Sequence, residues 1–501
     1  MINAATRAPI YDSRFISREK IGVALIFILA LGVRIGLRAG LEFDGLYGQD
    51  SFAYFDYAHS LADSITRTTV PPPFFWPIGY PALTAFASFF IPIEIAAQWI
   101  NILCGALIAT FTFLLARELT NNHRVAFIAA IIVAGAGQLF ISSLAIMADA
   151  SALMWTMISA YALARFNRAR SPKWIAGAGI ALGLAMMTRW IYALMIPVWF
   201  VALWKNKNEF AASFKNCARL ILFSLLALSP QIALMLYHAP NFPLAFIGDW
   251  ARTGWDITHA WQNVIVNNDG NFSYALPVAA FYALPLAQPT YIFPFLTAFV
   301  LVGAWSLRRD QFAARILIGW IAAQWIYLSG DAWENWRFAL AYFPPAAILA
   351  AMGVNYFFDS LPRAAPARFA RLTLLLASLL LTFIFGARAA EEFAANQKTD
   401  RAVAQWARES LPPQATVITF GITETLKHFT SFQVVELYNE TSASLLARAE
   451  SAEKFFVLVN VENLREQWQD RAPQINFDAL SRARSLRRVA AFGAYTLFAV
   501  E

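Results

Sequence analysis

The amino-acid sequence predicts a polytopic α-helical membrane protein of about 11 transmembrane helices, followed by a small extracytoplasmic α/β domain. The chain of 501 residues is 59% hydrophobic and only 14% charged, with a mean hydropathy of +0.50, which is too apolar for a soluble protein of this length. Apolar runs close to the roughly 20 residues needed to cross a bilayer recur from residue 21 to about residue 386. After residue 387 the composition becomes that of a soluble domain.

The apolar runs predict eleven spans, and no cleavage site follows the first run, so we expect it to be a retained span. The predicted spans cover residues 21–39, 94–116, 124–141, 149–166, 174–188, 190–204, 218–237, 290–307, 314–329, 338–357 and 370–387.

Basic residues cluster in alternate connecting segments, which places those segments in the cytoplasm by the positive-inside rule. Examples are Arg165, Arg168, Arg170 and Lys173 after the fourth span. This pattern puts the N-terminus in the cytoplasm and the C-terminus outside an inner (plasma) membrane. It divides the chain into a membrane domain over 1–387, with long outer loops at 40–93 and 238–289, and an outer domain over 388–501. The net charge of +7 lies in these clusters, which is typical of membrane orientation and not of nucleic-acid binding.

Local patterns predict further elements on the outer side. In the first outer loop "SFAYFDYAHSLADSI" has helical periodicity and "YPALTAFASFFI" is apolar but too short to cross, so we expect two interfacial helices. In the C-terminal domain "ATVITF", "FQVVELY" and "KFFVLVNV" are typical of strands. They alternate with helical "ITETLKHF", "SASLLARAESA" and "ENLREQWQDRA", and "RRVAAFGAYTLFAVE" predicts a closing hairpin.

Ionisable residues gather at the predicted outer boundary of the membrane domain. They are Asp44, Asp50, Asp56, Asp149, Arg189, Asp331, Glu334 and Arg337. Such residues are costly near a membrane and usually functional. A transporter would more often place them near the bilayer midplane on broken helices. The outer boundary instead favours chemistry on a lipid head group.

Three segments resemble a known family. "GQDSFAYFDYAHSL" followed by "PPPFFWPIGYPALTAF" is similar to the first luminal loop of the GT-C membrane glycosyltransferases, in the branch of the dolichyl-phosphate-mannose:protein mannosyltransferases and the bacterial aminoarabinose transferases. "SSLAIMADASALMWTMISAYALARF" resembles the second acidic position of that branch, and "NWRFALAYFPPAAILAA" resembles its Arg-aromatic segment. The resemblance covers about residues 20–360 in order and topology.

The resemblance implies roles for particular residues. Asp50 stands at the first-loop acid of the family, Asp149 at its second acid, and Arg337 at an arginine expected near the donor phosphate. Ser51 replaces the usual partner glutamate, which disfavours a two-carboxylate metal site there. Phe75 and Trp76 stand where some relatives have Glu-Lys, which weakens a tie to aminoarabinose transfer.

The family's chemistry is transfer of a monosaccharide from a polyprenyl-phosphate donor, with inversion, to a lipid, glycan or protein acceptor on the outer face. It requires a base for the acceptor hydroxyl, for which we choose Asp50. It also requires a cation for the leaving phosphate, for which Arg337 is the first candidate and Arg189 the second. Asp149 orients a donor hydroxyl, holds Arg189, or binds a divalent cation. Candidates for substrate binding are Tyr54, Trp255 and Trp261.

Simpler interpretations stand beside these. Asp50 is also a suitable N-cap for a helix that begins at Ser51, and Asp149 an ordinary boundary acid. The two arginines could snorkel to head groups, and most outer tryptophans fit an interfacial belt. Two other functions remain open: a flippase or transporter of lipid-linked sugars, and a noncatalytic envelope assembly protein that acts through its C-terminal domain.

Overall fold

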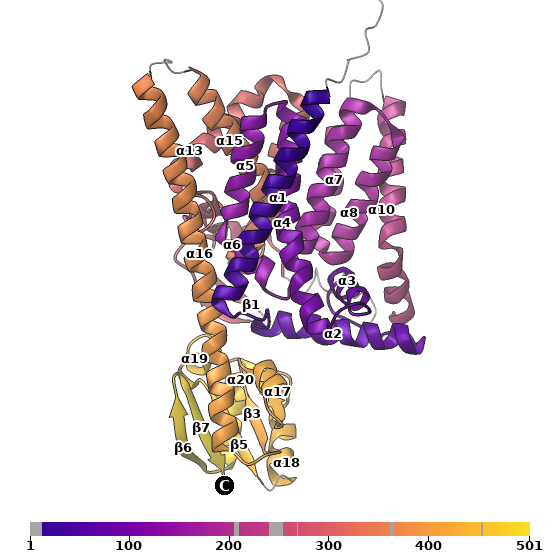
Figure 1. The fold of residues 1–501 in the computed structure, drawn as a ribbon. Coiled ribbons are helices and arrows are strands. Elements are labelled where there is room, and N and C mark those ends of the chain that lie inside the picture. Colours follow the sequence, from indigo (N-terminus) through magenta and orange to yellow (C-terminus); the bar gives the residue numbers. More distant parts are fainter. Residues whose placement is uncertain (1–12, 205–209, 240–253, 268, 361–364, 452–453) are drawn as a thin grey trace, which may run out of the picture.

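The structure is a computed structural model that describes residues 13–204, 210–239, 254–267, 269–360, 365–451 and 454–501. A bundle of apolar helices forms one end of the molecule and a small α/β domain the other, and the long helix α16 (Ala365–Ser410) joins them (Figure 1). Residues 240–253 and 268 of the second predicted outer loop lie outside the described residues.

Every predicted span falls on a helix or on two consecutive helices. These elements are α1 (Ser13–Leu41), α4 (Ile93–Thr120), α5 (His123–Gly135) with α6 (Gly137–Leu144), α7 (Asp149–Ala169), α8 (Pro172–Thr188), η1 (Trp190–Leu194) with α9 (Met195–Leu203), α10 (Phe210–His238), α13 (Pro294–Ser306), α14 (Gln311–Ser329), η6 (Trp336–Tyr342) with α15 (Phe343–Ser360), and α16.

Fewer of these elements are long enough to cross a membrane alone. Among the described residues, six helices have the length and hydropathy of a span, and the pair α5 and α6, bent by 59°, would be a seventh. The remaining helices at predicted spans are shorter or more polar. Several apolar helices of this kind make the chain an integral membrane protein, whereas the number of eleven crossings stays a prediction.

Small residues let the helices of the bundle approach closely. A Cβ added to Gly303 of α13 would lie 1.9 Å from the carbonyl oxygen of Leu349 of α15, and one added to Gly353 would lie 2.0 Å from that of Phe299. In a membrane the hydrophobic effect does not drive helices together, because lipid tails are as apolar as the side chains. Close contacts between backbones stabilise the association of the helices instead. Deeper in the bundle Trp199 of α9 meets Trp320 of α14 edge to face, with ring centroids 5.7 Å apart, and both side chains are fully buried.

The two helices predicted in the first outer loop are present. They are α2 (Gly48–Arg67) and α3 (Gly79–Ala87), and α2 runs across the end of the bundle that faces the C-terminal domain (Figure 1). Its inner face buries Phe52, Tyr54 and Phe55, while polar residues such as Asp63 and Arg67 remain exposed. One buried and one polar face at helical spacing explain its course along the surface of the bundle.

The C-terminal domain is built on a five-stranded sheet of order β4-β3-β5-β7-β6. The strands β3 (Thr416–Thr419), β4 (Gln433–Glu436) and β5 (Phe455–Val459) are parallel, and β6 (Leu486–Phe492) and β7 (Tyr495–Val500) form the predicted hairpin. Its helices are α17 (Thr423–Phe429), α18 (Ser442–Ser451), α19 (Val461–Arg465) and α20 (Ala472–Ala483). The predicted helix over 462–472 is shorter than expected, because only Val461–Arg465 is helical and a turn follows.

Helix α16 continues through residue 387, where the composition changes, and ends at Ser410. Beyond the bundle it holds the segment that precedes α2. Arg401 forms an ion pair with Asp44, and Gln397 Nε2 donates to the carbonyl oxygen of Leu46 at 2.7 Å. The C-terminal domain is thereby attached directly to the start of α2.

Candidate active site

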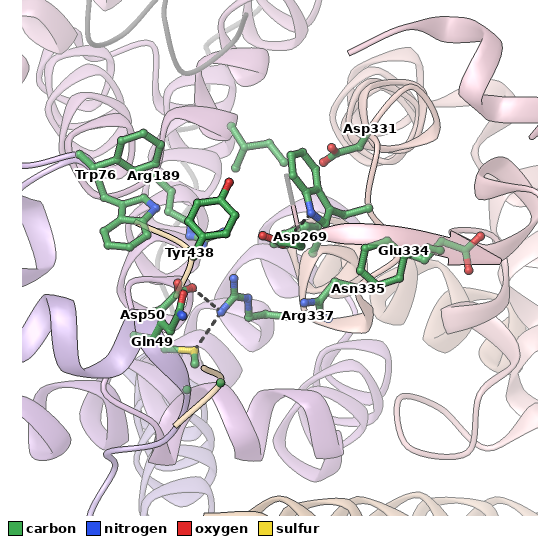
Figure 2. Close-up of a pocket in the computed structure, with 18 of the residues that line it drawn as sticks. Gln49, Asp50, Trp76, Arg189, Asp269, Asp331, Glu334, Asn335, Arg337 and Tyr438 are labelled. Carbon is green, nitrogen blue, oxygen red and sulfur yellow. Dashed lines mark hydrogen bonds and ion pairs between the residues drawn. The ribbon is translucent and has the colours of Figure 1, made fainter. Parts of the chain in front are cut away.

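A cavity of about 1040 Å³ lies where the helix bundle meets the C-terminal domain (Figure 2). Four parts of the chain line it: the start of α2 with the segment 75–77, the segment 189–191 with Met147, the segment from 327 to 338 with the hairpin β1 (Val264–Asn267) and β2 (Gly270–Ser273), and loops of the C-terminal domain. This volume is at the upper end of the range for small-molecule sites.

Asp50 lies in the first turn of α2 and does not cap it. The helix begins at Gly48, its N-cap is Tyr47, and no side chain caps it. The Asp50 carboxylate instead accepts a hydrogen bond from Arg337 Nη1, with Oδ2 at 2.8 Å. The N-cap interpretation of Asp50 is therefore wrong. A carboxylate in a first turn also gains from the positive end of the helix dipole.

Arg337 is placed by the turn that opens η6. The N-cap of η6 is Asn335, whose Oδ1 accepts from the backbone N–H of Arg337 at 3.0 Å. The guanidinium then reaches two carboxylates, because its Nε also lies 3.7 Å from Oδ2 of Asp149. Its side chain is 17% exposed, so these ion pairs are only partly screened by water.

Asp149 is the first residue of α7 and is buried between two arginines. Arg189, in the extended link between α8 and η1, places Nη1 3.1 Å from Asp149 Oδ1. The ring of Phe338 lies close to both guanidinium groups, with Cζ of Arg189 5.8 Å and Cζ of Arg337 5.3 Å from its centroid. Of the alternatives for Asp149, the structure contains the contact that holds Arg189.

The four residues Asp50, Asp149, Arg189 and Arg337, here called the ionic cluster, contain two positive and two negative groups in mutual contact. Removing one member of this network leaves the charge of its partner uncompensated. In a fully buried pair this lowers the free energy of unfolding by about 3–5 kcal/mol, and the loss is smaller in a partly buried one. Asp50, Arg189 and Arg337 line the cavity, whereas Asp149 supports the arginines from behind. The cluster therefore presents one carboxylate and two guanidinium groups to the same cavity.

Tyr54 lies one helical turn after Asp50 and also lines the cavity. Its side chain is 1% exposed, and its ring centroid is 5.4 Å from that of Trp76. The hydroxyl makes no hydrogen bond with the residues that the structure describes. Burial raises the pKa of Tyr54 well above its ordinary value, so the hydroxyl remains a neutral donor. A buried donor without a partner is suited to a ligand.

The structure does not bring Trp255 and Trp261 to the cavity. Trp255 donates its Nε1 hydrogen to the carbonyl oxygen of Tyr327 at 2.7 Å, and Trp261 is 79% exposed. The tryptophans that line the cavity are Trp76, Trp190, Trp333 and Trp468.

Besides Asp50, four acids line the cavity: Asp269, Asp331, Glu334 and Glu436. Sequence reasoning did not single out Asp269, whose Oδ2 accepts from Trp333 Nε1 at 2.8 Å. Desolvation raises the pKa of Asp269, a shift that the hydrogen bond from Trp333 opposes. Burial raises the pKa of Glu334 to about 7. Among the described residues, no group of three or more His, Cys, Asp or Glu side chains is arranged to hold a metal ion.

The comparisons with known proteins concern the fold and the family resemblance. The family of dolichyl-phosphate-mannose-protein mannosyltransferases matches residues 78–246, a segment that contains Asp149 and Arg189. ArnT from Cupriavidus metallidurans bound to undecaprenyl phosphate has a TM-score of 0.61 and 13% identity, over 97% of this chain and 98% of that chain. Its apo state has a TM-score of 0.64.

A second solved structure shares the fold. AglB, the oligosaccharyltransferase of Archaeoglobus fulgidus, in complex with an inhibitory peptide and a dolichol-phosphate, has a TM-score of 0.59 and 14% identity, over 89% of this chain and 70% of that chain. No curated protein sequence matches the chain. The predicted resemblance to GT-C membrane glycosyltransferases of the protein mannosyltransferase and ArnT type is confirmed, and at these identities the structural matches establish the fold.

Proposed function

We propose that the protein is an inverting glycosyltransferase that moves a monosaccharide from a polyprenyl-phosphate donor to a lipid, glycan or protein acceptor at the outer face of the inner membrane. The observation that carries the proposal is the ionic cluster, which joins a carboxylate to two arginines at the wall of a large cavity. The family match over 78–246 and the ArnT-like fold support the same reaction class.

The proposed reaction is a single displacement at the anomeric carbon. The acceptor hydroxyl attacks that carbon while its proton moves to the carboxylate of Asp50. The bond between the anomeric carbon and the phosphate oxygen breaks, and the electron pair leaves with the polyprenyl phosphate. Asp50 then releases the proton to water. Attack opposite to the leaving group inverts the anomeric configuration.

The leaving phosphate gains charge as this bond breaks, so fixed cations lower the barrier. Arg337 and Arg189 supply that charge in our proposal. Without donor, the carboxylates of Asp50 and Asp149 keep the two guanidinium groups in place. When the donor binds, its phosphate accepts the hydrogen bond that Arg337 Nη1 otherwise donates to Asp50. The carboxylate of Asp50 is then free to act as the base. Because Asp149 stays behind the arginines, it keeps them in position throughout.

The orientation of α7 supports reaction at the outer face. This helix starts with Asp149 at the ionic cluster and ends after 21 residues in the basic segment that contains Arg168 and Arg170. At about 1.5 Å per residue it is about 30 Å long, which is the thickness of a hydrocarbon core. If the basic segment is cytoplasmic by the positive-inside rule, the cavity opens on the opposite side.

The proposal is tested with purified protein in lipid nanodiscs and a panel of synthetic polyprenyl-phosphate monosaccharides. Envelope extract is added as a source of acceptor. We expect wild-type protein to release free polyprenyl phosphate from one of the donors. Asp50→Asn protein should release almost none. Release at the same rate from folded Asp50→Asn protein would reject Asp50 as the base. No release from any donor with extract present would reject the glycosyltransferase and favour the transporter or the assembly protein.

A further inference from the structure

The C-terminal domain forms one wall of the cavity, and the wall lies at the carboxyl ends of its three parallel strands. Phe420 follows β3, Tyr438 and Asn439 follow β4, and Asn463 follows β5, and all four residues line the cavity. From β3 the chain passes to one neighbouring strand, β4, and then returns to the other, β5. In open α/β sheets, ligands bind beyond the carboxyl ends of the strands where the strand order reverses in this way.

The chemistry of this wall differs from that of the ionic cluster. None of the cavity-lining residues that the C-terminal domain contributes is Lys or Arg, so the wall has no cation for a phosphate. It offers aromatic rings, side-chain amides and the carboxylate of Glu436 instead. Tyr438 is 40% exposed and points into the cavity (Figure 2), and its ring lies edge to face with that of Trp468, with centroids 5.7 Å apart.

The wall begins next to the proposed base. Gln49, the residue before Asp50, places Nε2 3.3 Å from Oε1 of Glu436. The other oxygen of Glu436 accepts from Asn439 Nδ2 at 2.9 Å. The side chains of Glu436 and Gln49 thus connect Asn439 to the residue next to Asp50. A ligand on Tyr438 and Asn439 therefore lies near Asp50, where an acceptor hydroxyl has to be presented.

The wall is also fixed before any ligand binds. The hairpin β1 and β2 holds it, because Gln467 Nε2 donates to the carbonyl oxygen of Asp269 at 2.8 Å and the backbone N–H of Asn271 donates to the carbonyl oxygen of Gln467 at 2.7 Å. The contact is close, since a Cβ on Gly270 would lie 2.5 Å from that carbonyl oxygen. Asn463 Nδ2 donates to Gln467 Oε1 at 3.0 Å, which orients its carbonyl oxygen. Preorganisation of this kind lowers the cost of binding.

We propose that this wall is an acceptor subsite for carbohydrate, in which a sugar ring packs on Tyr438 and its hydroxyls bond to the amides of Asn439 and Asn463. This inference rests on the proposed glycosyltransferase function and selects the glycan among the possible acceptors. A hydroxyl both donates and accepts, as a side-chain amide does. The C–H face of a sugar ring is apolar and suits an aromatic side chain that is anchored on one edge.

The test measures binding directly and needs no turnover. Methyl glycosides and short oligosaccharides are added to protein in nanodiscs with a protein belt, because glycoside detergents would compete, and saturation-transfer NMR reports their contact with the protein. We expect a subset of the glycosides to bind wild-type protein. Tyr438→Ala should weaken binding about two- to twelvefold, the value of one aromatic contact of about 0.5–1.5 kcal/mol. Tyr438→Phe should bind like wild type.

The control is Val489→Ala, an exposed side chain of β6 that does not line the cavity. This variant should bind glycosides like the wild type, which would show that substitution of an exposed residue of the C-terminal domain does not by itself weaken glycoside binding. Absence of binding by every glycoside, or equal binding by Tyr438→Ala, would overturn the subsite, as would competition by hydroxyl-containing peptides but not by glycans. Glycoside binding that depends on Tyr438, in a protein that releases no polyprenyl phosphate from any donor, would keep the carbohydrate site and reject the transferase.

Discussion

Arg337 Nη1 lies 2.8 Å from Asp50 Oδ2, although the two residues are 287 positions apart. The contact joins the first turn of α2 to the start of η6, and Asp149 and Arg189 extend it to α7 and the end of α8. The first outer loop, the start of the fourth predicted span, the link between the fifth and sixth spans, and the segment before the tenth span thus meet at one point. Each charge in the cluster has a neighbour of opposite charge. Substitutions of single members can therefore test the proposed proton acceptor separately from the shape of the guanidinium group.

Asp50→Asn removes the proposed base and keeps the shape of the side chain. We expect sugar transfer to fall by about 10²- to 10⁴-fold, the usual contribution of a positioned acid or base. The measurement is the rate of polyprenyl phosphate release at saturating donor. Asp63→Asn on the same helix is the control, because Asp63 is 72% exposed and, among the described residues, its ion pair is with exposed Arg67 at 4.0 Å. Equal rates for the two variants would count against a role of Asp50 in proton transfer.

Arg337→Lys keeps the positive charge but loses the planar fork that reaches Asp50 and Asp149 together. We expect a loss of about 10²- to 10³-fold in kcat, comparable to the removal of one donor that stabilises a transition state. Arg189→Lys should lose less, since the described contacts of Arg189 to carboxylates involve Asp149 alone. Arg67→Lys on the exposed face of α2 should be neutral. An ordinary kcat with a raised KM for Arg337→Lys would instead indicate ground-state binding of the donor.

The sequence predicts the parts of the ionic cluster but not their contacts. Asp50, Asp149 and Arg337 are found because each lies in a segment that resembles the family and because charges beside spans are costly. The ion pair of Asp50 with Arg337 depends on the packing of α2 against η6, which no local pattern contains. Local pattern also gave the wrong start for α2, since Asp in a first turn and Asp at an N-cap are both common.

Other misses have a physical cause as well. Hydropathy marks the end of a predicted span near residue 387 but not the end of α16, because the following segment is rich in Ala, Glu, Gln and Arg, which favour helix in water. A tryptophan in an outer loop is equally typical of a membrane interface and of a binding site, and only the fold decides which of these rings face the cavity. Tyr438 follows an ordinary strand, so its place in the cavity wall depends on how the C-terminal domain docks.

Tyr54→Phe tests whether the buried hydroxyl serves the donor. Because the hydroxyl has no partner among the described residues, its loss should not destabilise the protein, and the apparent melting temperature in nanodiscs should stay equal or rise. If the hydroxyl bonds to the donor, KM for the donor should rise about three- to tenfold, the value of one hydrogen bond. Tyr57→Phe is the control, since its hydroxyl donates to the carbonyl oxygen of Pro72 at 3.0 Å and does not line the main cavity. A lower melting temperature for Tyr54→Phe with unchanged KM would assign the residue to packing.

Glu334 gives the folded protein a predictable response to pH. Burial raises the pKa of its carboxyl from the ordinary 4.5 to about 7, and its Oε1 is buried without a hydrogen bond from the described residues. Between these two values the folded state binds more protons than the unfolded state. Stability from this group is therefore fully present below about pH 4.5 and decreases as the pH rises towards 7. Glu334→Gln cannot ionise, so it should escape this loss.

The measurement is the apparent melting temperature of wild-type and Glu334→Gln protein in nanodiscs at a series of pH values. The variant should gain on the wild type as the pH rises from about 4.5 to about 7, and the difference should then stay constant. Glu392→Gln, at an exposed position of α16, corrects for the general effect of removing a carboxylate. A difference between variant and wild type that does not change over this window would mean that Glu334 is ionised in the folded protein at low pH, and hence that water or an ion reaches its carboxylate.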